Sequence, residues 1–109
     1  MAVVDDEYVE AVLSLVESIP PGRVMSYGAI AEVIGAALGR GGPRLVGSVM
    51  ANYGGAVPWW RVVTASGRLP PGHEVAALRE LVAEGCALAV DGERVDMRRA
   101  AWTPRPQPR

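Results

Sequence analysis

Two short segments with helical spacing of apolar residues, separated by glycines and a proline, constrain the fold more than any other feature of this chain. The first follows Ser26, a residue type that often caps helices, and stops near Gly35 or at Gly39. The second covers residues 43–52 and begins at Pro43, because proline suits the first position of a helix. Two short helices joined by a glycine-containing turn predict a helix-turn-helix, although the connection is longer than in the tightest examples.

The helix expected over residues 43–52 has two faces of different character. The inward face is apolar, and its residues are Leu45, Val46, Val49 and Met50. The opposite face holds one arginine and then small residues, namely Arg44, Gly47, Ser48 and Ala51. Gly47 costs about 1 kcal/mol of helix stability relative to alanine, so packing or function should offset that loss. Small residues allow another backbone to come close, and that backbone belongs either to a second helix of this protein or to DNA.

Glycine and proline also divide the rest of the chain into short elements. A first helix, capped by Asp5 or Asp6, ends before residues 20–22, which are Pro-Pro-Gly. Residues 64–72 are rich in glycine and proline and predict a loop. A further helix is expected over residues 74–84, with a glycine directly after it.

The C-terminal part of the chain is typical of a β-hairpin followed by a tail. Residues 87–90 and 93–97 flank an Asp-Gly pair, which is a strong signal for a two-residue hairpin turn. Helices that close on a hairpin predict a mainly α fold with a small β part, a winged helix-turn-helix in a single domain over residues 1–97. Residues 98–109 are rich in arginine and proline and predict a poorly packed tail, apart from Trp102.

Composition limits the chemistry that is available. The chain has 109 residues, 50% of them hydrophobic, which is enough for one compact core. Cys86 is the single cysteine, which excludes an internal disulfide and a cysteine-cluster metal site. His73 is the single histidine, so the chain offers little from which a histidine-based zinc site could be built. We therefore expect no metal and no cofactor. No apolar run spans a membrane and the N-terminus is acidic, which predicts a cytoplasmic protein.

The charges are unevenly distributed although the net charge is only −1. No acidic residue occurs between Glu32 and Glu74, whereas four arginines do: Arg40, Arg44, Arg61 and Arg68. A cationic central segment in a nearly neutral protein predicts an anionic partner on one face. All eleven basic residues are arginines, which a GC-rich genome explains as well as selection for bidentate contacts does.

Residues 58–63 contain two adjacent tryptophans within a short apolar run. In an extended segment Trp59 and Trp60 would point to opposite faces, so both cannot enter the same core layer. A flat aromatic wall beside Arg61 is suited to stacking on a nucleobase. Two tryptophans packed into the core fit this short segment equally well.

The order and spacing of several motifs resemble the DNA-binding domain of O6-alkylguanine-DNA alkyltransferases, over most of the chain. The matching segments are Ile19-Pro20, Gly22-Arg23-Val24, Ser26-Tyr27-Gly28, Pro43-Arg44-Leu45-Val46-Gly47, Pro58-Trp59-Trp60-Arg61-Val62-Val63 and Ser66-Gly67 through Glu84-Gly85. The repair enzymes of that family carry Pro-Cys-His-Arg, whose cysteine accepts the alkyl group. Here Trp59 stands at the cysteine position and Trp60 at the histidine position, and neither indole forms a thiolate or acts as a base. The chain therefore resembles the non-enzymatic alkyltransferase-like branch, and this resemblance implies that it has no catalytic residue.

The resemblance also implies roles for individual residues. Arg44 matches an arginine that replaces a rotated nucleotide, Tyr27 a tyrosine that helps to rotate the 3′ phosphate, and Asn52 an asparagine that braces the turn before the pocket. Trp60 departs from the usual histidine, so that Glu84, which matches a supporting glutamate, is expected to be only a solvated residue. The implied DNA-binding residues are Tyr27, Arg44, Gly47, Ser48, Ala51 and Asn52. The implied alkylguanine pocket consists of Tyr27, Trp59, Trp60, Arg61 and Arg68, with Gly72 and His73 near the loop position that meets the base.

These implications lead to a functional hypothesis with two alternatives. The resemblance predicts a monomeric DNA damage sensor, associated with the bacterial nucleoid, that flips O6-alkylguanine out of double-stranded DNA and marks it for nucleotide excision repair. The first alternative is an active alkyltransferase that uses Cys86, although a small buried apolar residue is the favoured interpretation of this cysteine. The second is a winged-helix regulator of transcription, which would need long polar side chains where this helix has glycine, serine and alanine.

Overall fold

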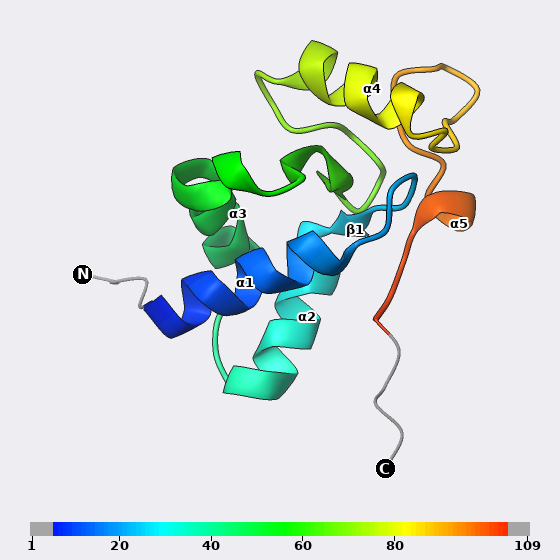
Figure 1. The fold of residues 1–109 in the computed structure, drawn as a ribbon. Helices are drawn as coiled ribbons and strands as arrows, with labels where there is room; N and C mark the ends of the chain where they lie inside the picture. The colour runs from blue at the N-terminus through cyan, green and yellow to red at the C-terminus, as the bar shows by residue number, and fades with distance from the viewer. Residues whose placement is uncertain (1–5, 105–109) are drawn as a thin grey trace.

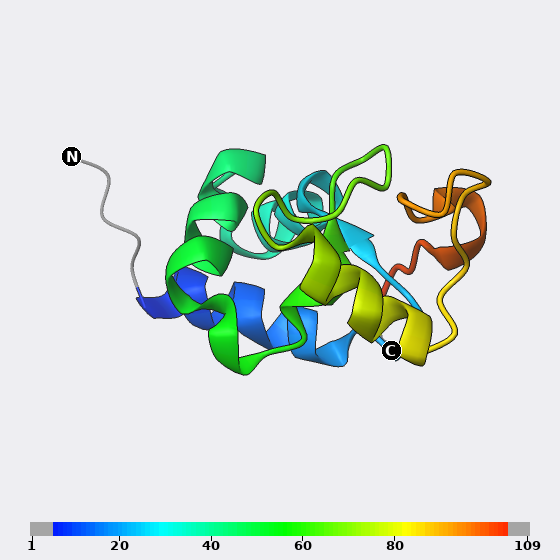
Figure 2. The ribbon, with the colours of Figure 1, turned by 90° about the horizontal axis from the view of Figure 1, so that it is seen from above.

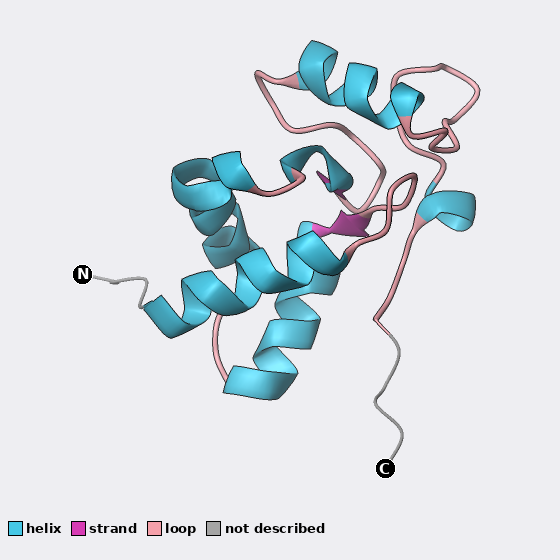
Figure 3. Ribbon diagram, viewed as in Figure 1, coloured by secondary structure: helices cyan, strands magenta, loops and turns pink. Residues whose placement is uncertain are grey.

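The computed structural model describes residues 6–104 and shows a mostly helical molecule with one very small sheet (Figures 1 and 3). Five α-helices and two 3₁₀ turns follow one another along the chain. The helices are α1 (Asp6–Ser18), α2 (Tyr27–Leu38), α3 (Pro43–Tyr53), α4 (Glu74–Ala83) and α5 (Met97–Ala100), and the 3₁₀ turns are η1 (Gly54–Ala56) and η2 (Trp59–Arg61). The mainly α fold with a small β part is confirmed.

Helices α1, α2 and α3 enclose the larger of two hydrophobic clusters. Tyr8, Val12 and Val16 lie four residues apart on α1 and are fully buried, because that spacing places them on one face of the helix. They pack against Ile30 of α2 and Val46 of α3. The apolar spacing in the sequence was thus a correct guide to these three helices.

The connection between α2 and α3 confirms the predicted helix-turn-helix. The Ser26 hydroxyl accepts a hydrogen bond from the Ala29 N–H at 3.0 Å and caps the start of α2. Helix α2 ends at Gly39, which has a left-handed φ of 72°. Gly41 also has a positive φ of 91°, and a Cβ at this position would overlap the phenol of Tyr8. The turn therefore passes close against α1.

A parallel pair of two-residue strands joins the two halves of the molecule. Strand β1 (Met25–Ser26) pairs with β2 (Val62–Val63), with Met25 opposite Val62 and Ser26 opposite Val63. Directly before β1, Val24 enters the second hydrophobic cluster, which also holds Val63 and Leu81 of α4. The sheet thus fixes η2, the turn just before β2, between the two clusters.

Three expectations about elements need correction. Residues 59–61 form the 3₁₀ turn η2 and not a strand, so the adjacent indoles are not on opposite faces. The hairpin is reduced to one antiparallel bridge between Leu88 and Val95. Its turn spans residues 90–93, because the Asp91 carboxylate accepts hydrogen bonds from the two backbone N–H groups of Glu93 and Arg94 and holds a longer loop.

The segment after residue 97 is better packed than expected. Helix α5 buries Ala100, which is 1% exposed, and Ala101 forms a parallel bridge with Val24. The Trp102 N–H donates to the Val24 carbonyl at 2.8 Å. Residues 105–109 lie outside the described residues, and the domain boundary at residues 97 and 98 stays a prediction.

The two ends of the molecule carry different elements. Helix α3 lies at one end and α5 at the other, as Figures 1 and 2 both show. Within residues 6–104, no helix combines the length and the apolarity that are needed to cross a bilayer.

Candidate functional site

A cavity of about 410 Å³ opens between α3 and the loop that precedes α4. Its volume lies in the range of sites that hold small molecules or single bases, roughly 300–1,000 Å³. Side chains from four separate parts of the chain line it: Tyr27, Gly47, Met50, Ala51, Trp59, Pro70, Pro71 and His73. The cavity therefore combines an aromatic wall, a small-residue rim and a few polar groups.

Trp59 forms the aromatic wall and is half-buried. Its ring meets the ring of Trp60 at a centroid distance of 5.7 Å and an angle of 82°. On another side it meets the imidazole of His73, also at 5.7 Å, at an angle of 62°. Edge-to-face contacts of this kind hold aromatic rings in defined orientations. Trp59 thus belongs both to the cavity and to the edge of the second hydrophobic cluster.

The small-residue face of α3 is not packed against another part of the protein. Arg44, Ser48 and Ala51 are exposed, and a Cβ built at Gly47 would meet nothing within 4 Å. Packing within the molecule therefore does not account for Gly47, and of the two alternatives the contact with a second helix of this protein is excluded for the described residues. Asn52 is exposed, and its side-chain amide donates to the Ser48 carbonyl at 2.9 Å.

The structure brings together only part of the residue set that was expected to form the pocket. Tyr27 and Trp59 line the cavity, whereas Trp60 and Arg61 are not among its lining residues and contact Glu84 instead. Arg68 lines a separate depression with Asp91 and other residues, because its segment turns back where its N–H donates to the Thr64 hydroxyl at 2.9 Å. These three residues are not among those that line the cavity, and their part in an alkylguanine pocket stays a prediction.

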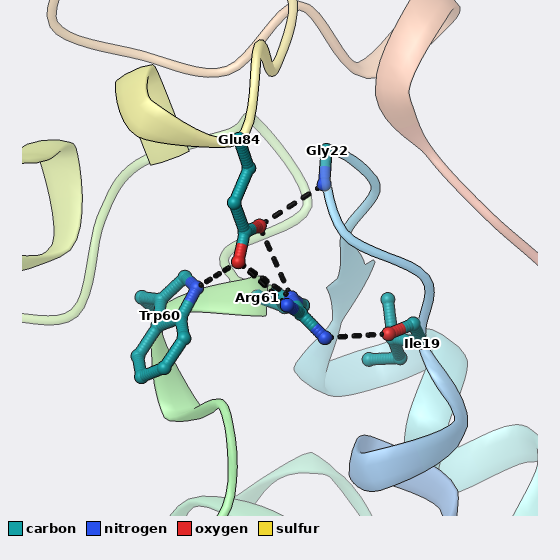
Figure 4. Close-up of polar contacts among 5 residues, drawn as sticks. All are labelled: Ile19, Gly22, Trp60, Arg61 and Glu84. Carbon is teal, nitrogen blue, oxygen red and sulfur yellow. Dashed lines mark hydrogen bonds and ion pairs between the residues drawn. The ribbon is translucent and has the colours of Figure 1, made fainter. Parts of the chain in front are cut away.

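Close to η2, the carboxylate of Glu84 accepts hydrogen bonds from four N–H donors of two separate segments (Figure 4). The Trp60 indole N–H donates at 2.9 Å, the Gly22 backbone N–H at 3.0 Å and the Arg61 Nε–H at 3.1 Å, and Arg61 Nη2 forms an ion pair with the same carboxylate. Arg61 Nη1 also donates to the Ile19 carbonyl at 2.8 Å. We call Trp60, Arg61, Glu84 and the two backbone groups the Glu84 network.

The expectation that Glu84 is a solvated residue was wrong. Its side chain is 13% exposed and that of Arg61 is 12% exposed. Burial opposes ionisation, but hydrogen bonds from Arg61, Gly22 and Trp60 outweigh it and lower the pKa of Glu84 below the ordinary value of 4.5. The spacing between residues 60 and 84 gives no sign of this contact, because it depends on how α4 folds back onto η2.

Cys86 is buried in the second cluster and is not among the residues that line the cavity. Burial raises the pKa of its thiol, and the nearby Glu84 charge raises it further, while Arg23 acts in the opposite direction. A thiol in such surroundings is protonated and inert near neutral pH. Its interpretation as a small buried apolar residue is confirmed.

The sequence did not single out every residue of the cavity. Met50 was assigned to the inward face of α3, and Pro70 and Pro71 only to a loop. His73 was noted near the base-contacting position, and the structure places it in the cavity beside Trp59. Phenol burial raises the pKa of Tyr27, the other titratable group of the cavity.

Comparisons with known proteins agree with this geometry. The family described as "6-O-methylguanine DNA methyltransferase, DNA binding domain" matches residues 7–85. The DNA base-flipping protein of Escherichia coli (strain K12) is 31% identical over 102 residues, which cover 90% of this chain and 76% of the relative. A protein of the same name from Vibrio parahaemolyticus is 29% identical over 103 residues, which cover 91% of this chain and 99% of that relative. The crystal structure of S. pombe Atl1 with damaged DNA containing O6-carboxymethylguanine superposes with a TM-score of 0.74, at 28% identity over 94% of this chain and 100% of Atl1.

Proposed function

This chain belongs to the family of the 6-O-methylguanine DNA methyltransferase DNA-binding domain and is an alkyltransferase-like protein, and from that premise we propose that it is a non-enzymatic sensor of O6-alkylguanine in duplex DNA. The single observation that carries the proposal is the cavity walled by Trp59 beside the unpacked small-residue face of α3. The names of its relatives support the same function, since two of them are called DNA base-flipping proteins and Atl1 was solved in complex with damaged DNA.

In the proposed complex, α3 enters the minor groove through its small-residue face. Gly47, Ser48 and Ala51 have too little bulk to keep the sugar-phosphate backbone away. Arg44 is exposed at the start of α3 and can stack in the gap that an extruded nucleotide leaves. Tyr27 at the cavity edge assists by contacting the phosphate that rotates with the base.

The cavity then holds the extruded base against Trp59. Extrusion costs a few kcal/mol, and less for a weakly paired lesion, which supplies part of the selectivity. Stacking of a base on an aromatic ring returns about 1–3 kcal/mol. An alkyl group on the base adds apolar surface that Met50, Pro70 and Pro71 can cover.

The lesion stays bound and is not repaired by this protein. Trp59 offers no nucleophile, and Cys86 is a buried thiol outside the set of residues that line the cavity. The persistent complex would therefore mark the site, and nucleotide excision repair is the pathway that we propose as its recipient.

The test compares two duplexes of one sequence that differ only in O6-methylguanine or guanine at one position. We expect tighter binding of the duplex with the lesion, and loss of that preference in Trp59→Ala. Arg44→Ala should weaken binding to both duplexes, and Arg79→Ala on the exposed part of α4 is the matched control. Equal affinity of the unchanged protein for both duplexes contradicts the proposal and favours a sequence-reading regulator. A gain of one methyl mass on the protein after incubation contradicts the non-enzymatic assignment.

A further inference from the structure

The ring of Trp60 is restrained on several sides in the structure. Its indole N–H donates to Glu84 Oε2 at 2.9 Å. The Arg61 guanidinium carbon lies 5.6 Å from the centre of its ring, and the Trp59 ring meets it nearly at a right angle. A tryptophan side chain has two rotatable bonds, and one directional hydrogen bond together with two ring contacts is enough to fix both.

We propose that Trp60 and Glu84 are positioning residues, which fix the ring of Trp59 as a rigid wall of the base cavity. This inference rests on the proposed function, because it explains how the wall is held ready before a base arrives. Trp60 and Glu84 do not touch the base in this scheme. They act through Trp59, the member of the group that lines the cavity.

The Glu84 network can hold Trp60 in place because the Glu84 carboxylate accepts hydrogen bonds from several N–H donors at once. Glu84 receives N–H donors from η2 and from the turn after α1, and Arg61 continues the network to the Ile19 carbonyl. Hydrogen bonds to an ionised carboxylate are stronger than neutral ones, and partial burial reduces competition from water. The turn η2 is thereby tied both to the end of α4 and to the end of α1.

Because of its indole chemistry, Trp60 can hold the ring of Trp59 in place but cannot take part in proton transfer. An indole N–H donates a hydrogen bond but cannot accept a proton or pass one on. The network therefore orients a ring and does not activate a group. A wall that is ordered in the free protein reduces the entropy that is lost on binding, so its benefit appears as affinity for the extruded base.

The experiment follows Trp59 directly, since the chain has only three tryptophans. In the background Trp102→Phe, the second changes Trp60→Phe and Trp60→His each leave Trp59 as the sole tryptophan. Phenylalanine keeps an aromatic ring but has no N–H donor. Histidine restores one, because its five-membered ring can overlay the pyrrole ring of the indole with Nε2 at the position of the indole nitrogen. Trp102 is remote in sequence and packs on the other cluster, so Trp102→Phe alone is the matched control.

We expect faster local motion of Trp59 in the Trp60→Phe protein than in the Trp60→His protein, measured by time-resolved anisotropy and acrylamide quenching without DNA at about pH 8, where the unperturbed imidazole is neutral. The affinity for the O6-methylguanine duplex should fall about fivefold to tenfold in Trp60→Phe and recover in Trp60→His, as expected for one lost hydrogen bond. Affinity for the undamaged duplex should change less than about twofold, because the cavity is empty in that complex. Glu84→Gln removes the charge at nearly constant size, and in the Trp102→Phe background it should lower the lesion affinity in the same direction as Trp60→Phe does.

Equal motion of Trp59 in the two proteins overturns the proposal, and so does an unchanged lesion affinity in Trp60→Phe. A protein that binds both duplexes equally before any change contradicts the proposed function, and the DNA-free measurement then decides the positioning role alone. Circular dichroism and thermal unfolding of each variant show whether it is folded at the measuring temperature. If Trp60→Phe does not fold, Glu84→Gln in the Trp102→Phe background decides through the lesion affinity, with Arg79→Ala as its control.

Discussion

At the scale of single residues, Gly47 has opposite expected effects on helix stability and on DNA binding. It lies in the middle of α3 and lines the cavity, yet no neighbouring atom of the protein requires a glycine there. We expect Gly47→Ala to raise the free energy of unfolding by about 0.5–1 kcal/mol, because alanine is the better helix former. The same change should weaken DNA binding, because the added methyl group lies on the face that approaches the backbone. Chemical denaturation and duplex titration measure the two effects, and a stabilised protein with unchanged DNA affinity would show that this face does not meet DNA.

His73 and Arg68 are the two polar residues of the loop that the sequence offered for contact with the base. The structure places His73 in the cavity against Trp59 and Arg68 in a different depression. We expect His73→Ala to lower affinity for the duplex with the lesion by about three- to tenfold, since a ring contact and a polar group are lost. Arg68→Ala should weaken binding to the two duplexes by the same factor. A selective loss of lesion binding in Arg68→Ala would show instead that Arg68 contacts the base.

At the scale of elements, the turn between α2 and α3 depends on one glycine much more than on its neighbour. Gly41 combines a φ of 91° with contact against Tyr8, whereas Gly42 has an extended φ of −161° and open space around it. We expect Gly41→Ser to cost about 2 kcal/mol or more in unfolding free energy, from backbone strain and overlap. Gly42→Ser is the matched control and should be neutral or slightly stabilising, because serine is a good N-cap. Urea unfolding of both variants checks the pair, and similar losses in both would contradict the role of Gly41.

The elements also show which structural features a single sequence can predict. Local signals were sufficient for α1, α2 and α3, since Ser26, Pro43 and the glycine at position 39 mark helix ends by their own chemistry. The pairing of β1 with β2 was not predictable, because two-residue strands have no periodicity and their partners lie far apart in the chain. The same distinction applies to the site. The positions of Trp59 and Tyr27 in the sequence motifs predicted their place at the cavity, whereas the hydrogen-bond partners of Glu84 became visible only in the tertiary structure.

At the scale of the whole molecule, two hydrophobic clusters meet at a narrow junction. One lies between α1, α2 and α3, and the other under α4, with the two-residue strands and the Glu84 network between them. The network therefore bridges both clusters, through Ile19 on one side and Glu84 on the other. The cavity opens near the same junction, so that its wall depends on both clusters being folded.

The junction makes stability sensitive to acid through Glu84. Folding lowers the pKa of this carboxyl, so that the unfolded chain takes up its proton at a higher pH than the folded chain does. The stabilisation is complete above the ordinary value of 4.5 and is lost as the pH falls through the lowered folded value. We expect Glu84→Gln to reduce the unfolding free energy at neutral pH by about 3 kcal/mol, because Arg61 loses its charged, partly buried partner. The change should also flatten the decline in stability below about pH 4.5. Asp91 also has a lowered pKa, but it is a surface group, so Asp91→Asn is the control and should leave most of the acid dependence in place. Denaturant titrations from neutral pH into the acid range measure both curves, and an acid decline as steep in Glu84→Gln as in the unchanged protein would show that the network does not hold the two clusters together.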